Sequence, residues 1–194
     1  MWGFLRRWAA PAHNQGVKRV CEDETIGIRQ FKLEDTEPLY LAARESVEEL
    51  CKWMVWCRSD YSLEDSRAFI VRSQAEWEKG SWYTFVIYDK HGGEFLGSIG
   101  LSAVDRVHGF AQLGYWVRKG RRGKGIGAAA VRLAAGYAFE ELGIFRIELI
   151  IPVGNSASAR VAENAGANLE GVLNGRVLLN GTRHNAAIYS LVRA

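Results

Sequence analysis

Apolar and polar residues alternate near the start of the chain and then recur at helical spacing. Residues 26–31 alternate apolar with polar or small side chains, which predicts a first strand. Three helices follow in the pattern: one that Asp35 can cap, one over residues 47–56 after Ser46, and one over residues 63–79. The first part of the chain is therefore expected to run from a strand into helices.

The middle of the chain has the pattern of consecutive antiparallel strands. Residues 82–88 and 94–104 flank the turn residues D-K-H-G-G, which predicts a hairpin. A further strand over residues 108–118 follows a short loop. Three antiparallel strands are therefore expected before a basic, glycine-rich turn.

A helix and a parallel strand are expected after that turn. Residues 125–142 place apolar side chains on one face at helical spacing, and Gly143 can cap the C-terminus. Residues 146–151 form an apolar strand. Because a helix precedes it, this strand should lie parallel to the strand before that helix.

A short helix and a hairpin close the chain. Asn155 or Ser156 can cap the helix. Residues 169–179 and 183–192 flank an Asn-Gly pair, which favours a tight hairpin turn. The whole pattern predicts a mixed α/β architecture with antiparallel strands first, one parallel crossover, and a final hairpin.

Size and composition point to one globular domain. The chain has 194 residues, of which 48% are hydrophobic and 24% charged. We expect the domain to span residues 25–194, after an N-terminal extension of residues 1–24. Residues 1–8 are too short and interrupted for a signal-peptide core; they suit a loosely ordered end or a small membrane-surface or partner-binding segment. No apolar run approaches the roughly 18 residues that span a bilayer, so no membrane span is expected.

Charge and cysteine usage exclude several function classes. A net charge of +3 gives no argument for nucleic-acid binding, and none is expected. The three cysteines form no C-x-x-C pair and the four histidines lie far apart, so no metal site is expected. These features fit a reducing compartment, and we expect a cytoplasmic location.

The turn before the long helix carries the clearest chemical signal. Residues 121–127 read R-R-G-K-G-I-G. The first turn of a helix has unpaired N–H groups and partial positive charge, so it binds anions, and glycines let an oxygen approach closely. Cationic side chains cluster here too, at Arg118, Lys119, Arg121, Arg122 and Lys124. A phosphorylated cofactor is the leading hypothesis, with a solvated basic turn as the alternative.

Two nucleotide interpretations fit this turn poorly. Arg118 stands where a nucleoside-triphosphate P-loop needs its first glycine, and Gly125 stands where it needs Ser or Thr. The spacing G-x-G-x-x-A at residues 125–130 matches a dinucleotide fingerprint. However, Glu148, the acidic residue at about the required distance, falls inside a strand, and hairpins precede the loop.

Coenzyme A is the third interpretation. Arg122, Gly125 and Gly127 fill the frame R/Q-x-x-G-x-G/A in the strand–loop–helix context that it requires. With this frame the sequence resembles the Gcn5-related N-acetyltransferases (GNAT) over residues 25–192, and it is most similar to the bacterial ribosomal-protein N-terminal acetyltransferases of the RimJ/RimL type. The carrying segments are G-Y-W-V at 114–117, G-K-G-I at 123–126, N-S-A-S at 155–158, L-E-G at 169–171, and L-N-G at 179–181 followed by His184 and Tyr189.

The resemblance implies a GNAT-like mixed α/β (α+β) fold. A central, mostly antiparallel sheet of seven strands, flanked by helices, would contain one parallel, splayed pair. The pantetheine arm of acetyl-CoA would enter the gap, and CoA would be the product. The binding residues implied are Tyr115, Trp116, Val117, Arg122, Gly123, Lys124, Gly125, Ile126, Gly127, Asn155 and Ser158. Tyr115 and Trp116 can instead be plain strand aromatics, and Asn155 a helix N-cap.

The resemblance also implies two catalytic residues. Ser158 matches a serine that protonates the departing thiolate, and Glu170 matches a glutamate that helps deprotonate the amine, directly or through water. A surface serine and an exposed strand glutamate are the alternatives. No cysteine is placed for a covalent acetyl intermediate, so direct transfer in a ternary complex is expected.

The expected acceptor is a primary amine, in first place the N-terminal α-amine of a ribosomal protein. Two alternatives remain open: a small amine (a polyamine, amino acid or antibiotic), or a non-catalytic acyl-CoA-binding module. Ala167 and Asn185 depart from the family's usual Phe and Asp, and the second departure puts the usual acceptor in doubt. Residues expected to attract or line the path of the amine are Glu45, Glu48, Glu49, Trp53 and Trp56. The protein is expected to be a monomer or homodimer.

Overall fold

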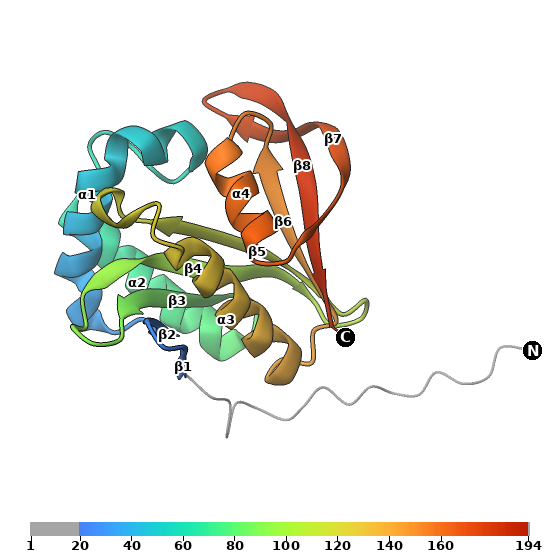
Figure 1. The fold of residues 1–194 in the computed structure, drawn as a ribbon. Helices are drawn as coiled ribbons and strands as arrows, with labels where there is room; N and C mark the ends of the chain where they lie inside the picture. Colours follow the sequence, from blue (N-terminus) through green and yellow to red (C-terminus); the bar gives the residue numbers. More distant parts are fainter. Residues whose placement is uncertain (1–19, 194) are drawn as a thin grey trace, which may run out of the picture.

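One mixed sheet organises the computed structural model, which describes residues 20–193 (Figure 1). Its eight strands lie in the order β1-β2-β3-β4-β5-β6-β8-β7. Within the described residues β5 and β6 pair in parallel, and the other neighbouring strands pair antiparallel. The strands are β1 (Val20–Glu22), β2 (Ile26–Gln30), β3 (Tyr83–Asp89), β4 (Phe95–Asp105), β5 (Phe110–Val117), β6 (Arg146–Pro152), β7 (Asn168–Leu179) and β8 (Thr182–Val192).

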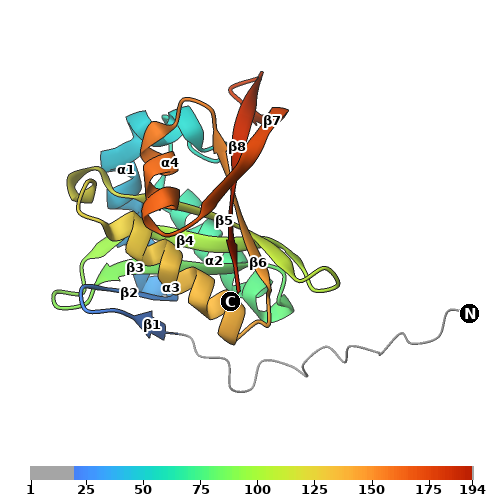
Figure 2. The ribbon, with the colours of Figure 1, turned by 45° about the vertical axis from the view of Figure 1, so that its right-hand side comes forward.

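Helices cover both faces of this sheet. Helices α1 (Thr36–Trp53) and α2 (Leu63–Lys79) lie over one face, and α3 (Ile126–Glu140) and α4 (Ser156–Asn164) lie over the other (Figures 1 and 2). One hydrophobic core lies mainly under α1 and α2 and the other mainly under α3 and α4, and Trp77 at the end of α2 packs in the second.

The core under α3 combines stacked rings with a close helix. The ring centroids of Trp77 and Phe85 lie 4.9 Å apart, and those of Phe85 and Tyr137 lie 5.0 Å apart, with edge-to-face geometry. Ala130 and Ala134 are fully buried, and their small side chains let α3 lie close to the sheet. Burying each large side chain contributes about 1.5–3 kcal/mol to folding.

The parallel pair opens into a wedge. Phe110–Gln112 of β5 pairs with Arg146–Glu148 of β6, and the pairing ends there. Strand β5 continues to Val117, while β6 stays paired with β8 along its whole length. The two strands therefore separate toward their C-terminal ends, where the basic turn and α4 begin.

The expected architecture is confirmed, and helix α2 begins and ends at the predicted residues. Ser62 caps it: its hydroxyl accepts from the Asp65 N–H at 3.1 Å, and the Asp65 carboxylate accepts from the Ser62 N–H at 2.9 Å. Gly80, with φ +70°, ends the helix in the left-handed conformation.

Other details of the prediction are wrong. The two helices expected around Ser46 form the single helix α1, because the Ser46 hydroxyl accepts the Lys119 N–H (2.9 Å) and does not interrupt its own helix. Asp35 precedes α1 without capping it, since its carboxylate binds Arg29 and the Lys32 N–H.

The sheet has eight strands instead of seven. The additional strand, β1, pairs antiparallel with β2 and falls within the expected extension of residues 1–24. Residues 1–8, with their expected terminal segment, lie outside the described residues.

Candidate functional site

The turn between β5 and α3 holds open backbone. Gly123 and Gly125 have φ values of +75° and +79°, and a Cβ at either position would have no heavy atom within 4 Å. Gly125 is the N-cap of α3, no side chain among residues 20–193 caps this helix, and its first turn has no acidic residue. The first-turn N–H groups are therefore available to an anion.

Gly127 serves a different purpose from its two neighbours. A Cβ there would lie 3.2 Å from the Val161 side chain and 3.3 Å from the Tyr115 ring. Its lack of a side chain lets the first turn of α3 pack directly against α4 and β5. The spacing of the three glycines thus fixes both the turn and its position beside the wedge.

A cavity of about 570 Å³ lies beside this turn, and we call it the loop cavity. Its wall comes from the end of α1, the end of β5, the turn with the start of α3, and α4. Every cofactor-binding residue expected from the sequence contributes to the lining except Lys124, which is exposed. Its volume is typical of a site for a small molecule or cofactor.

Two hydroxyl groups meet at the inner end of the loop cavity. The Tyr115 hydroxyl oxygen is buried and has no hydrogen-bond partner of normal geometry among residues 20–193. Burial raises the pKa of Tyr115, and the neighbouring Ser158 hydroxyl opposes this rise. Sequence reasoning assigned only main-chain contacts to Tyr115 and missed its hydroxyl.

Asn155 is the N-cap of α4, as one expectation had it. Its side-chain oxygen accepts the Ser158 N–H at 3.2 Å. The cap uses the oxygen of the amide, so the NH₂ group can still donate into the loop cavity, which Asn155 also lines. Both roles expected for this residue are therefore compatible.

Arg122 lies between the main chain and a carboxylate. Its Nε donates to the Val117 carbonyl at 3.0 Å, and its Nη1 lies 3.5 Å from Glu49 Oε2. Lys119 Nζ lies 3.7 Å from the other oxygen of Glu49. A carboxylate of α1 thus contacts the basic turn at the wall of the loop cavity.

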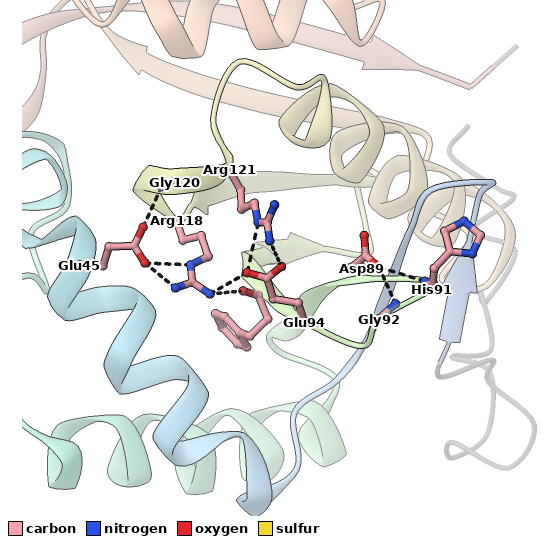
Figure 3. A network of polar contacts seen from close by, with 9 residues as sticks. Glu45, Asp89, His91, Gly92, Glu94, Arg118, Gly120 and Arg121 are labelled. Atoms are coloured by element: carbon pink, nitrogen blue, oxygen red, sulfur yellow. Dashed lines mark hydrogen bonds and ion pairs between the residues drawn. The ribbon is translucent and has the colours of Figure 1, made fainter.

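The other arginines of the basic cluster hold the fold together. Arg118 binds Glu45 and Glu94, and Arg121 binds Glu94 (Figure 3). Glu45 also accepts the Gly120 N–H at 2.7 Å, so the network ties α1 and the start of β4 to the turn. Arg118 and Arg121, two of the five clustered cations, are therefore anchors of the fold, already bound by carboxylates.

Figure 3 also shows the turn between β3 and β4, where Asp89 accepts the main-chain N–H groups of His91 and Gly92. This turn places Glu94 beside the arginines. The acidic residues expected to attract an amine are thus engaged elsewhere: Glu45 in the network and Glu49 at the basic turn. Glu48 lines neither cavity.

Glu170 lies apart from Ser158. Its carboxylate forms a two-pronged ion pair with Arg146 (2.7 and 2.5 Å) and accepts the Ser190 hydroxyl at 2.7 Å. The Arg146 guanidinium and then Ser190 lower the pKa of Glu170 to about 2. Glu170 lines neither cavity, so the structure does not bring the two expected catalytic side chains together.

A second cavity of about 480 Å³, which we call the aromatic cavity, lies between the sheet and helices α1 and α2. It shares Met54, Tyr115 and Trp116 with the loop cavity, so the two cavities meet at the end of β5. Trp56 lines the aromatic cavity and Trp53 the loop cavity, a division that sequence reasoning missed. Such an arrangement can bring together two molecules that enter from different sides.

Among the described helices, none is long and apolar enough to cross a membrane.

The family model "Acetyltransferase (GNAT) domain" matches residues 25–168. "Putative ribosomal N-acetyltransferase YdaF" of Bacillus subtilis is 32% identical over 88% of this chain and 93% of that protein. Spermidine N(1)-acetyltransferase of Escherichia coli (strain K12) is 27% identical over 63% of this chain and 73% of that protein.

A solved structure agrees with these relatives. The microcin C7 self-immunity acetyltransferase MccE, in complex with acetyl-CoA and AMP, has a TM-score of 0.81 and 27% identity, covering 88% of this chain and 94% of that one. The chain belongs to the GNAT acetyltransferase family and is an acetyl-CoA-dependent N-acetyltransferase.

Proposed function

We propose that this acetyltransferase acts on the N-terminal α-amine of a protein, with a ribosomal protein as the preferred acceptor. The observation that carries the proposal is the meeting of the two cavities at Tyr115 and Trp116, which allows donor and acceptor to be bound together. That geometry supports direct attack of the amine on the donor. None of the three cysteines, all within the described residues, lines either cavity as an alternative nucleophile.

The loop cavity suits acetyl-CoA. In this proposal the N–H groups from Gly123 to Gly127 and the Arg122 guanidinium bind the diphosphate, and exposed Lys124 adds attraction from outside. The main chain of β5 from Tyr115 to Val117 pairs with the pantetheine arm. The Asn155 amide donates to the same arm. The diphosphate would occupy the open space beside Gly123 and Gly125, which the Cβ of any other residue would partly fill.

Bound acetyl-CoA supplies an acetyl thioester, which the amine converts to an amide with release of the CoA thiol. Ser158 lies where it can donate a proton to the sulfur as it departs. The Tyr115 hydroxyl beside it can return that proton or hold Ser158 in position. Free N–H groups at the end of β5 would stabilise charge on the acyl oxygen.

The amine itself needs little help to lose its proton. An α-amine has a pKa near 8, so about a tenth of it is neutral at pH 7. Glu170 was expected to assist, directly or through water. Its ion pair with Arg146 and its pKa of about 2 favour a structural role, and we propose that solvent takes the proton.

Relatives support two acceptor classes. The name of YdaF points to ribosomal protein, and that of the spermidine enzyme to a small polyamine. We propose the α-amine because the lining of the aromatic cavity carries Arg58 and Arg72 against one acid, Asp65, a poor setting for a polycation. We also propose a location in the cytoplasm, where thiols stay reduced, because the three cysteines are free, and we keep the expectation of a monomer or homodimer.

Thiol release from acetyl-CoA tests the proposal. Peptides with a free α-amine should release CoA, and the same peptides with a blocked N-terminus and an internal lysine should not. Spermidine serves as the polyamine arm of the assay. Release with spermidine alone would favour the small-amine alternative, and tight CoA binding with no release from any amine would favour a binding module.

A further inference from the structure

A row of small residues forms the floor of the aromatic cavity. Thr84, Gly100 and Gly114 lie directly opposite one another on β3, β4 and β5. All three line the cavity. A Cβ at Gly114 would have no described heavy atom within 4 Å, whereas one at Gly100 would lie 3.3 Å from the Trp82 indole nitrogen. Three adjacent strands thus leave a flat hollow in the sheet, where larger side chains would fill the space under α1 and α2.

Aromatic rings stand around this hollow. Trp56 lies 5.6 Å from Tyr61 and 6.2 Å from Trp116 between ring centroids, and Phe69 lies 5.6 Å from Trp82. Trp56 is 44% exposed even though it belongs to this group of rings. A flat floor between aromatic walls has the shape and polarity to take a planar apolar group.

One cation at the rim, Arg72, forms no close ion pair among the described residues, although, after Lys79 and Ser81, its charge also helps to lower the pKa of Glu76. The Arg72 guanidinium lies 5.6 Å from the centre of the Trp82 ring and forms no ion pair with a described residue. Glu76, one turn further along α2, is bound by Lys79 and Ser81. Arg58 is different, since it already binds Asp60 and Asp65. Arg72 is thus the lining cation that an acidic ligand can pair with.

We propose that the aromatic cavity selects an acceptor whose α-amine belongs to an aromatic residue followed by an acidic one. The ring would lie on the floor at Gly114, beside the Trp82 indole that covers Gly100, and the carboxylate would pair with Arg72. The α-amine would then face Tyr115 and Trp116, the wall shared with the loop cavity. This inference rests on the proposed function, because it names the acceptor for the same reaction.

Charge and shape both argue against the alternative acceptors. A polyamine would bring several positive charges to a lining that holds two arginines and one carboxylate. A peptide beginning with Ala would leave the hollow unfilled and lose the apolar contact. The aromatic, acidic acceptor satisfies both features at once.

Peptide kinetics and an amine-free probe test the inference together. Peptides beginning Trp-Asp, Ala-Asp and Trp-Lys are compared by thiol release, and indole-3-propionate, which has a ring and a carboxylate but no amine, is titrated by calorimetry. Trp-Asp should exceed the other two by at least about tenfold in kcat/KM. The probe should bind the wild-type protein and compete with the Trp-Asp peptide.

Three variants assign the effect to its residues. Gly114→Leu fills the hollow and should weaken probe binding at least about tenfold, while the Kd for CoA stays unchanged. Arg72→Gln should remove the preference for Trp-Asp over Trp-Lys. Gly136→Leu is the matched control, since Gly136 lies on α3, lines neither cavity, and also has no atom within 4 Å of a Cβ. It should leave both readouts unchanged.

The outcomes separate the two proposals. Equal rates with Trp-Asp and Ala-Asp would overturn the inference and leave the proposed function intact. Absence of thiol release with every amine would count against the proposed function, and probe binding would then test the cavity alone. A probe that fails to bind, or that binds Gly114→Leu as well as wild type, would overturn the inference.

Discussion

Glu49 Oε2 lies 3.5 Å from Arg122 Nη1, so a carboxylate of α1 faces the turn that we propose for the diphosphate of acetyl-CoA. This oxygen is buried and accepts no hydrogen bond of normal geometry from a described residue. The pair balances the charge of Arg122 before a ligand binds. When acetyl-CoA binds, its diphosphate would be attracted by Arg122 and repelled by Glu49.

Replacing Glu49 by Gln should therefore strengthen CoA binding. Removing a negative charge within a few ångströms of the diphosphate should tighten the Kd about three- to tenfold at low salt, since partly exposed charges interact through a high effective dielectric. Calorimetric titration with CoA measures the change. Glu48→Gln, an exposed neighbour on the same helix outside both cavities, is the control. Weaker binding by Glu49→Gln would mean that Glu49 chiefly orients Arg122.

Gly125→Asp should abolish acetyl-CoA binding and leave the fold largely intact. The new carboxylate would occupy the open space at the N-terminus of α3 and repel the diphosphate, for a loss of at least about a hundredfold in affinity. Gly143→Asp is a matched control, because Gly143 also has a positive φ (+67°) and open space at its Cβ, but lies beyond the other end of α3. Unchanged affinity in Gly125→Asp would rule out the turn as the diphosphate site.

Ser158→Ala should lower kcat by about ten- to a hundredfold with little change in the Kd for CoA, since a positioned acid acts on the transition state. The Asn155 cap survives this change, because it uses the main-chain N–H of residue 158. Ser156→Ala, in the first turn of the same helix, tests for a general effect on α4. A normal kcat in Ser158→Ala would transfer the acid role to Tyr115, which Tyr115→Phe would then reveal.

Glu170 should matter for acid stability more than for catalysis. Its folded pKa of about 2 lies below its ordinary value of 4.5, so the ionised form favours the folded state. This contribution is fully present above about pH 4.5 and is lost as the pH falls toward 2. Glu170→Gln should therefore flatten the fall in stability across that window, measured by denaturant unfolding at several pH values.

The kinetic side of the same variant separates two roles. If Glu170 serves the ion pair with Arg146, kcat at neutral pH should fall by less than about threefold, against a hundredfold or more for a general base. Glu24→Gln, which replaces an exposed glutamate, is the control for the unfolding measurements at several pH values. A large loss of kcat with unchanged stability would restore the catalytic role expected from the sequence.

Local chemistry explains what the sequence could predict. The Ser62 capping box and Gly80 define α2, and the glycines at 123, 125 and 127 mark the basic turn, because each depends on neighbours a few residues away. The parallel crossover followed from a helix between two strands. The glycines of the basic turn, together with four other short segments, carried the resemblance to the family, which the comparisons confirm.

Long-range contacts explain what the sequence could not show. Ser46 looked like a break between helices, but its hydroxyl meets Lys119 across the fold. Glu170 looked free, but Arg146 and Ser190 bind it. The aromatic cavity depends on the strand register that places Gly100 opposite Gly114. In the sequence, the small residues that alternate along the adjacent predicted strands were the one feature that pointed to this cavity.

Initial-rate kinetics test the central claim, that donor and acceptor occupy adjoining cavities at the same time. Thiol release is measured while acetyl-CoA and an α-amine peptide are varied together. The account predicts reciprocal plots whose lines intersect, as a ternary complex requires. Parallel lines, the pattern of a covalent acetyl-enzyme, would contradict it.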